Sequence, residues 1–489
     1  MSSNHTEVNE ERNSLPAFWL AIVTAVALLV RVVTLLIYQP VAFSDTPSYR
    51  RLAEAVLQGF TSYDGTRTPG YPVFLALVGS DQRVWLAQLF LGLITTLLFF
   101  YIGWKLTDKP WFAGVVGLAH TLNLGQLFFE SNLLTESLTT FLVVLTMAGV
   151  LYWLINPLKR RLWLAFALGL ISSCTLLVRP LFIYLPFITL LALWLSPQAE
   201  TGLAVSKDGE IKPGGTTESR LNMRHRLMGL VFLVPVAGLL GGWVAFIHAQ
   251  FGDWSLTTMT GYHLVQHTGS YFEYVPDEYA SLRDVYIRYR DAHIAQYGTQ
   301  TNTIWEAIPE MSRVSGNSFY GLSRVLTRIS VQLIVQHPWL YLKNVISGWW
   351  MFWRTAVYWS ADALRLPWMA GGIQLAIQVE RAVLLLSNLV FIFASVAFVF
   401  TASLSALRHN QGLQLINIKP PTRKLFIWTL LGTIWIASVV QTLLDHGDNP
   451  RFLVPLQSLV VLCVTVFIFQ FARDKLQRAN TPHQGDARD

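Results

Sequence analysis

Long apolar runs recur along the 489-residue chain and restrict what it can fold into. A helix needs roughly 20 apolar residues to cross the hydrocarbon core of a membrane, and there it satisfies its own backbone hydrogen bonds. Only 13% of the residues are charged, which is too few for the surface of a soluble protein of this size. We therefore predict an all-α polytopic membrane protein with about ten transmembrane helices, within a range of roughly nine to thirteen. The expected spans are residues 17–38, 82–104, 111–129, 133–155, 162–178, 181–196, 227–249, 377–402, 425–443 and 452–472.

Basic residues lie in short clusters between these runs and indicate the orientation of the chain. Short cytoplasmic loops are enriched in Lys and Arg, and the clusters all fall on one side if the N-terminus is cytoplasmic. This topology explains the formal charge of +7 better than a nucleic-acid partner does. It requires the Trp-rich segment 345–358 not to cross. We expect Pro338–Tyr358 to be a helix along the outer surface, with a genuine crossing as the alternative.

The polar segments between the runs predict the domain organisation. No internal repeat is visible, so an inverted-repeat transporter gains no support. Cys174 and Cys463 both lie in apolar runs and indicate neither a disulfide framework nor a metal site. The expected parts are a cytoplasmic tail (1–16), an N-terminal transmembrane module (17–249) with an outer loop (39–81) and a cytoplasmic linker (196–226), an outer segment with interfacial helices (250–358), C-terminal transmembrane helices (359–472) and a cytoplasmic tail (473–489).

The first outer loop contains a polar interruption, Phe43–Pro72, with two candidate functional residues. From Thr46 onward the pattern is that of an amphipathic helix, which we expect to lie on the outer leaflet with its apolar face down. Asp45 then sits at the helix N-terminus, where the carboxylate is ionised, and it is either a helix cap or a functional acid. Arg67 follows in a Pro/Gly turn, where its planar fork of donors can bind a phosphate or reach lipid headgroups.

Four segments resemble the GT-C membrane glycosyltransferases, in particular the branch with bacterial aminoarabinose transferases and protein O-mannosyltransferases. They are SDTPSYRRLAEAVLQG, RTPGYPVFLAL, FFESNLLTESL and DNPRFLVPLQSLVVL, in that order. The resemblance implies outer-loop juxtamembrane helices, a polyprenyl-phosphate-linked sugar donor, and transfer on the periplasmic or extracellular side. It also implies that Asp45 is the catalytic acid of the first loop and that Arg67 and Arg451 bind the donor phosphate. Relatives often carry two neighbouring acids, whereas Ser44 and Thr46 flank Asp45 here, which argues against a metal held by paired carboxylates.

The chemistry of glycosyl transfer assigns roles to the same residues. A base must take the proton of the acceptor hydroxyl, and cationic groups must stabilise the departing lipid phosphate. Asp45 is the expected general base, and Arg67 and Arg451 are the expected phosphate ligands. The resemblance implies inversion at the anomeric carbon. The expected partners are the lipid-linked donor, membrane lipids and an unidentified lipid, glycan or protein acceptor, at the inner or plasma membrane. A transporter or lipid flippase, or an O-antigen-ligase-like enzyme, stays open as an alternative.

Further polar residues near the outer boundary are candidate substrate contacts, because carboxylates and arginines near membrane depth usually have a function. For Glu136 the alternative is a helix-start charge, and for Arg179 a turn arginine at the interface. His263 and His267 have helical spacing, which favours a structural or acceptor-contact role. Asp445 and its neighbours leave a metal site open as an alternative to plain loop polarity, but we predict no metal and no other cofactor. The candidate substrate contacts are Tyr49, Tyr71, Glu130, Glu136, Arg179, His446 and Asp448.

Overall fold

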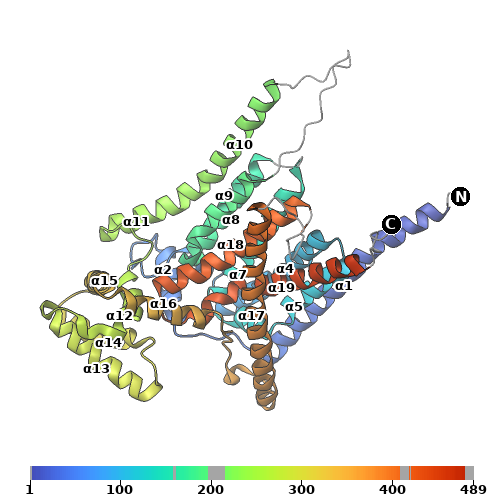
Figure 1. Cartoon of the computed structure of the whole chain (residues 1–489). Helices are drawn as coiled ribbons and strands as arrows, with labels where there is room; N and C mark the ends of the chain where they lie inside the picture. Colours follow the sequence, from blue (N-terminus) through green and yellow to red (C-terminus); the bar gives the residue numbers. More distant parts are fainter. Residues whose placement is uncertain (1–2, 158–160, 197–214, 408–417, 419, 480–489) are drawn as a thin grey trace, which may run out of the picture.

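The computed structural model describes residues 3–157, 161–196, 215–407, 418 and 420–479, and in these ranges the chain is helical without any strand (Figure 1). Each of the ten expected spans corresponds to one or more described helices. Some of these helices are long enough to cross a membrane, and others are shorter but apolar. They are α1 (Ser3–Ile37), α4 (Asp81–Thr107), α5 (Pro110–Thr121), α6 (Leu124–Ser131), α7 (Glu136–Ile155), α8 (Leu162–Val178), η2 (Pro180–Tyr184), α9 (Leu185–Trp194), α10 (Gly215–Val236), η3 (Ala237–Gly241), α11 (Gly242–Phe251), α17 (Ala370–Leu407), α18 (Pro421–Leu444) and α19 (Asn449–Ala479).

Seven of the described helices are long and apolar enough to cross a membrane, and the bent pair α5–α6 makes an eighth. Helices α8 and α9 are apolar but shorter. The prediction of an all-α polytopic membrane protein is therefore confirmed. The most buried span is α19, with 72% of its apolar window inside the protein, whereas only 17% of that of α1 is buried. The large apolar core accordingly gathers around α7, α18 and α19, and α1 offers most of its surface to lipid.

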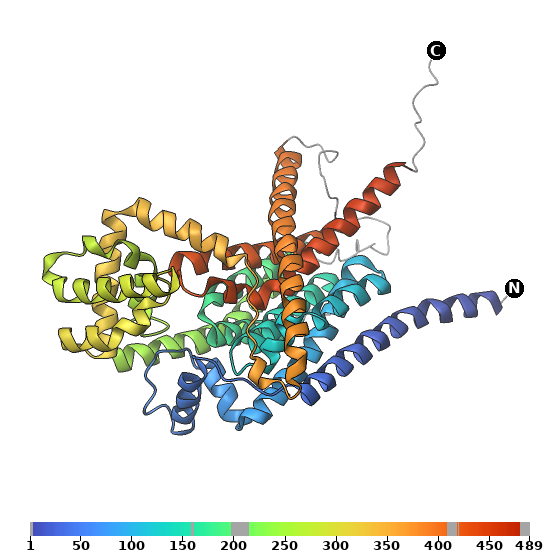
Figure 2. The ribbon, with the colours of Figure 1, turned by 90° about the horizontal axis from the view of Figure 1, so that it is seen from below.

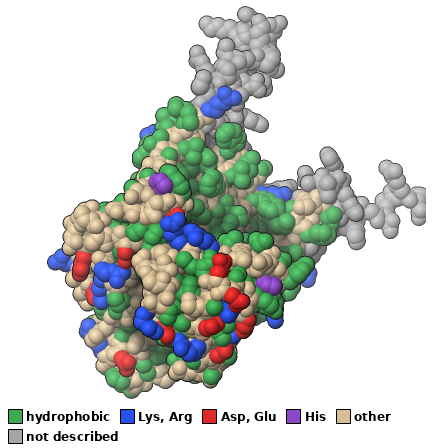
Figure 3. Space-filling model, turned by 90° about the vertical axis from the view of Figure 1, so that its left-hand side faces the viewer, with side chains coloured by type: hydrophobic (Ala, Val, Ile, Leu, Met, Phe, Trp, Pro, Cys, Tyr) green, Lys and Arg blue, Asp and Glu red, His purple; other side chains and the backbone are tan. Residues whose placement is uncertain are grey.

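Four helices of the expected outer segment share a core of their own. Helices α12 (Thr260–Thr268), α13 (Ala280–Tyr297), α14 (Thr303–Ser315) and α15 (Phe319–Gln336) pack around residues such as Tyr262, Ile304 and Leu326. This outer helical cluster lies at the end of the molecule opposite the two termini, as both ribbon views show (Figures 1 and 2). In Figure 3, acidic and basic side chains gather on the lower part of the face, and the upper part is largely hydrophobic.

The Trp-rich segment forms α16 (Pro338–Phe352), which packs against α18 and α19. Its 15 residues make a helix about 22 Å long, at about 1.5 Å per residue, which is shorter than the roughly 30 Å hydrocarbon core. Helix α16 is thus too short to span the membrane by itself. Its expected position along the outer surface stays a prediction.

The segment 39–81, expected to be the first outer loop, forms α2 (Thr46–Leu57) and α3 (Gly70–Val78). The apolar face of α2 does not face lipid, so that part of the prediction is wrong. Tyr49 packs with Tyr71 of α3, and Leu52 lies in a cluster with Leu177 of α8 and Trp243 of α11. An apolar stripe indicates only that a helix has an apolar neighbour, and here this neighbour is protein.

Candidate active site

Asp45 lies between α1 and α2, and its carboxylate joins two arginines that are distant in sequence. One oxygen, Oδ1, accepts a hydrogen bond from Arg67 Nη2 at 2.7 Å, and Oδ2 accepts one from Arg451 Nη1 at 2.6 Å. The side chain makes no capping hydrogen bond to α2, although Asp45 occupies the N-cap position. The helix-cap alternative therefore does not explain this residue.

The ion pairs continue from Asp45 to two further charged residues. Arg451 also binds Glu136, the first residue of α7, through Nε to Oε1 and through Nη2 to Oε2 at 3.4 Å. The same Glu136 accepts a hydrogen bond from Arg179 Nη1 at 3.0 Å. Three guanidinium groups thus share two carboxylates, which leaves one formal positive charge in the network. Five residues singled out from the sequence lie in this single network, which we call the arginine–carboxylate network: Asp45, Arg67, Glu136, Arg179 and Arg451.

The electrostatic environment keeps Asp45 ionised. Burial raises the pKa of this carboxyl, but the guanidinium groups of Arg67 and Arg451 reverse the effect and hold the pKa below its usual value. Both carboxylate oxygens are engaged by these arginines. With these partners Asp45 is a weak base.

Acid is expected to weaken the contribution of Asp45 to stability. Because the folded protein has the lower pKa, the unfolded chain binds the proton first as pH falls below about 3.9. The stability difference between the wild type and Asp45→Asn is expected to be constant from about pH 8 to about pH 5 and to shrink as the pH falls through the unfolded-state pKa toward the folded one. Thermal unfolding in detergent at stepped pH measures this difference. A difference that grows on acidification would contradict the lowered pKa.

A close approach of two helices positions the Arg67 turn beside Arg179. Gly70 opens α3 directly after Thr68 and Pro69, and a Cβ atom built on it would lie 2.5 Å from the backbone nitrogen of Val178 and 2.6 Å from the carbonyl oxygen of Leu177. Only glycine permits this contact with the end of α8, and Arg179 follows immediately.

Replacing Gly70 with alanine is expected to destabilise the protein by about 1–3 kcal/mol, because the added methyl group must displace backbone rather than a side chain. It also moves the Arg67 turn away from Arg179, so any function of the network should decline. Gly372→Ala is the matched control, since open space surrounds Gly372 near the start of α17. Thermal unfolding of both variants tests this, and equal midpoints would show that the close contact has no energetic weight.

The arginine–carboxylate network borders a cavity of about 610 Å³, within the range of roughly 300–1,000 Å³ common for small-molecule sites. Arg67 lies over the ring of Tyr49 at 5.5 Å, and Arg179 lies over the ring of Phe452 at 4.2 Å. Five of the site residues predicted from the sequence line the cavity: Asp45, Tyr49, Arg67, Arg179 and Arg451. Apolar side chains also line the cavity and are here called its apolar wall: Leu181, Ile183, Leu240, Val244, Leu264 and Leu444.

Other candidate residues lie outside the lining of this cavity. Tyr71 is buried and donates to Gln88 at 3.0 Å. Glu136 contacts the cavity arginines but does not line the cavity itself. Glu130 pairs with Arg31 at 2.6 Å in the packed interior, where Gly92 leaves room for its carboxylate.

The segment between α18 and α19 holds two more of the candidates, and both lie outside the cavity lining. His446 packs against His267 and Gly348. Asp448 accepts a hydrogen bond from the hydroxyl of Tyr358. Neither residue lines the cavity, so neither has a direct path to a molecule bound there.

One residue of structural interest was not selected from the sequence, and the pairing of two others was not predicted. Arg31 is an arginine inside the first apolar run, and this isolated charge was the available signal for a buried partner. His263 and Asp445 line the cavity and contact each other at 3.0 Å. Their 182-residue separation left no local pattern by which sequence reasoning could pair them.

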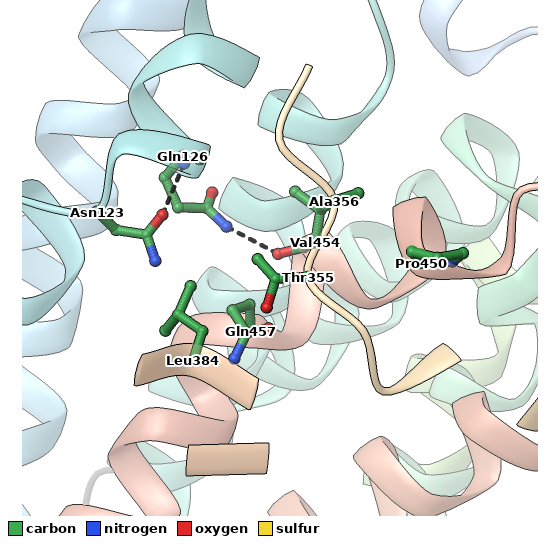
Figure 4. Close-up of a pocket in the computed structure, with 9 residues that line it drawn as sticks. Asn123, Gln126, Thr355, Ala356, Leu384, Pro450, Val454 and Gln457 are labelled. Carbon is green, nitrogen blue, oxygen red and sulfur yellow. Dashed lines mark hydrogen bonds between the residues drawn. The ribbon is translucent and has the colours of Figure 1, made fainter. Parts of the chain in front are cut away.

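A second, small cavity of about 10 Å³ lies at the break between α5 and α6, with room for no more than a single water molecule (Figure 4). Gln126 donates from Nε2 to the carbonyl oxygen of Val454 and from its backbone nitrogen to Asn123 Oδ1, both at 2.8 Å. The first bond ties the broken helix to α19, and the second caps the N-terminus of α6. The cavity is too small to bind a substrate.

No three His, Cys, Asp or Glu side chains in the described ranges are placed to hold a metal ion. The prediction that the protein uses no metal or other cofactor stays a prediction.

No family model matches the chain, and no curated protein matches its sequence. Its fold is similar to the crystal structure of the oligosaccharyltransferase of Archaeoglobus fulgidus, determined with a tethered acceptor peptide containing the NVT sequon. The two share 12% sequence identity with a TM-score of 0.46, and the alignment covers 95% of this chain and 50% of that one. The chain thus spans about half the length of the archaeal protein. This similarity is too distant to assign an activity.

Proposed function

We propose that this protein is an integral membrane glycosyltransferase that moves a sugar from a polyprenyl-phosphate donor to an acceptor hydroxyl. The observation that supports it best is the placement of Asp45, Arg67, Arg179 and Arg451 on one cavity. Guanidinium groups are suited to bind a phosphate, and a carboxylate is suited to remove the proton of a hydroxyl. The apolar wall of the same cavity offers a surface to the hydrocarbon chain of the donor.

The donor phosphate and Asp45 compete for the same guanidinium groups. In the free protein Arg67 and Arg451 both bind Asp45, and the network has one excess positive charge. A phosphodiester anion that binds these arginines weakens their hold on Asp45 and raises its basicity. The base thereby becomes effective once the donor is bound, which would limit idle proton transfer in its absence.

The proposed transfer of the sugar uses the Asp45 carboxylate and the guanidinium groups of the arginines. The acceptor oxygen attacks the anomeric carbon from the face opposite the phosphate, a new carbon–oxygen bond forms, and the bond from the anomeric carbon to the phosphate oxygen breaks. Asp45 takes the acceptor proton, and the lipid phosphate leaves with an additional negative charge. Arg67, Arg179 and Arg451 stabilise that charge more strongly than they stabilise the donor diester. The product has the inverted configuration at the anomeric carbon.

The site lies on the same side as the outer helical cluster. The cavity is lined by residues of α12 and of the first outer loop, and the cluster lies at the end of the molecule opposite the termini (Figures 1 and 2). With a cytoplasmic N-terminus, this geometry supports a site on the periplasmic or extracellular face of the inner or plasma membrane.

Transfer of label from a lipid-linked sugar tests the proposal directly. Protein purified into lipid nanodiscs is given a panel of radiolabelled polyprenyl-phosphate hexoses and pentoses together with a membrane extract. The expected result is label in a product of the extract and release of polyprenyl phosphate. Lipid translocation without sugar transfer would favour a flippase, and use of pyrophosphate-linked donors alone would favour a ligase-like enzyme. Either outcome would overturn the proposal.

A further inference from the structure

A histidine–aspartate pair lies on the same cavity, apart from the arginine–carboxylate network. His263 Nδ1 is 3.0 Å from Asp445 Oδ2, and both residues line the cavity. The other oxygen of Asp445 accepts a hydrogen bond from the backbone nitrogen of Gly447 at 2.9 Å. Both oxygens of this carboxylate are therefore occupied, and its orientation is fixed by a helix of the outer cluster and by the loop before α19.

The partner of Nδ1 determines what the other ring nitrogen of His263 can do. Burial raises the pKa of Asp445, but His263 reverses this effect and holds it below its usual value, so the carboxylate only accepts hydrogen bonds. The proton of a neutral imidazole must then be on Nδ1, and Nε2 presents a lone pair. Nε2 makes no hydrogen bond to any residue that the structure describes, and 32% of the side chain is exposed.

The surroundings of this pair combine hydrogen-bonding groups with an aromatic ring. Thr257, Thr260 and Gln441 line the cavity together with the pair. Trp254 also lines it, and its ring stacks on His248 with the ring centres 4.0 Å apart. Hydroxyl and amide groups that both donate and accept, next to an aromatic face, suit a molecule with several hydroxyl groups better than an apolar one.

We propose that His263, oriented by Asp445, binds a hydroxyl group of the acceptor, and that the acceptor is a polyhydroxylated glycan. This inference rests on the proposed function. The donor sugar is bonded directly to a phosphate and therefore lies beside the arginines. The His263–Asp445 pair has its own set of partners and binds the second substrate. His263 contacts a hydroxyl that does not react, and Asp45 receives the proton of the hydroxyl that does.

Steady-state transfer separates the two substrates. With saturating donor, His263→Ala is expected to raise the half-saturating concentration of the membrane extract by about tenfold. This is the usual contribution of one hydrogen bond to substrate affinity. With saturating extract, the half-saturating concentration of the donor should change less than twofold. His263→Gln, which retains a hydrogen-bonding group near the position of Nε2, should recover part of the loss.

The matched control is His293→Ala. His293 Nδ1 is 3.1 Å from Glu306 Oε1 in a similar pair of the outer helical cluster, away from the cavity lining. This variant is expected to behave as the wild type for both substrates. Polyprenyl phosphate alone should raise the thermal midpoint of all three histidine variants as it does for the wild type, which shows that each is folded and binds the donor phosphate.

The chemical class of the acceptor is tested on the extract itself. Periodate cleaves vicinal diols, so periodate oxidation followed by borohydride reduction should abolish acceptor capacity, whereas protease treatment should leave it intact. Loss of capacity with protease alone would identify a protein acceptor and overturn the assignment. A rise in donor rather than acceptor half-saturation in His263→Ala would place the pair at the donor sugar and overturn it too.

The outcomes also separate this inference from the proposed function. If Asp45→Asn stops transfer while His263→Ala leaves both half-saturating concentrations unchanged, the proposed function stands and the acceptor assignment falls. If the wild type transfers no sugar, both fall together.

Discussion

Asp45→Asn is expected to lower the rate of sugar transfer by about 10²–10⁴-fold, the usual contribution of a general base. Asparagine keeps the size of the side chain, and its one amide oxygen can still accept a hydrogen bond from either Arg67 or Arg451, which bind the two oxygens of Asp45 at 2.7 Å and 2.6 Å. It cannot take the acceptor proton. Binding of polyprenyl phosphate should persist or become tighter, because the amide no longer competes as an anion for the arginines. Single-turnover transfer and thermal shift with polyprenyl phosphate measure the two effects separately.

The control for this experiment is Asp81→Asn. Asp81 starts α4 and pairs with Arg50 of α2, so it belongs to the same region of the protein. Its side chain is 46% exposed, and an exposed ion pair contributes about 0–1 kcal/mol. This variant should transfer sugar at nearly the wild-type rate. Equal rates for Asp45→Asn and the wild type would reject Asp45 as the base, whatever the family of the enzyme.

Arg451→Leu is expected to cause the largest combined loss of stability and function. The Arg451 side chain is only 11% exposed and binds both Asp45 and Glu136. Its removal leaves the wholly buried carboxylate of Glu136 with Arg179 as its one remaining ion-pair partner in the described chain. Breaking a buried ion pair by removing one partner costs about 3–5 kcal/mol. The thermal midpoint should fall accordingly, and the stabilisation by polyprenyl phosphate should disappear.

Arg451→Lys separates charge from geometry. Lysine retains the positive charge but not the planar fork that reaches two carboxylates, so stability should recover in part while transfer stays low. Arg423→Leu is the matched control, because Arg423 pairs with the exposed Asp108 at 2.5 Å and lies outside the cavity lining. Its midpoint should change little. If Arg451→Leu still responds to polyprenyl phosphate as the wild type does, Arg451 is not a phosphate ligand.

Much of the architecture could be predicted because the membrane imposes a simple length rule. Each expected span, including the shorter 162–178 and 181–196, corresponds to described helices. The convergence of Asp45, Arg67 and Arg451 was also foreseeable, since chemistry with a lipid phosphate needs an acid and cations at one membrane boundary. Their direct ion pairs in the structure are consistent with that expectation, and their catalytic roles stay a proposal.

Contacts between residues far apart in the chain could not be predicted from the sequence. Hydropathy does not distinguish a helix face covered by protein from one covered by lipid, so the packing of α2 on α3, α8 and α11 was missed. Glu130 and Glu136 are six positions apart, and both were expected to contact substrate. In the structure Glu130 pairs with Arg31 in the interior, and Glu136 pairs with Arg179 and Arg451. Such partners depend on how distant helices are placed side by side, and no local pattern encodes that.

The order in which the chain is made has a consequence for the arginine–carboxylate network. Arg451 is 406 residues after Asp45 and 315 residues after Glu136, and it enters with the last long helix. During synthesis the earlier charged residues must therefore reach the membrane boundary before their shared cation exists. A chain that stalls before α19 would hold Glu136 with Arg179 and Asp45 with Arg67, without the arginine that joins the two pairs. Completion of the final helix thus joins membrane insertion to the assembly of the whole network, and incomplete chains should lack the stability that Arg451 contributes.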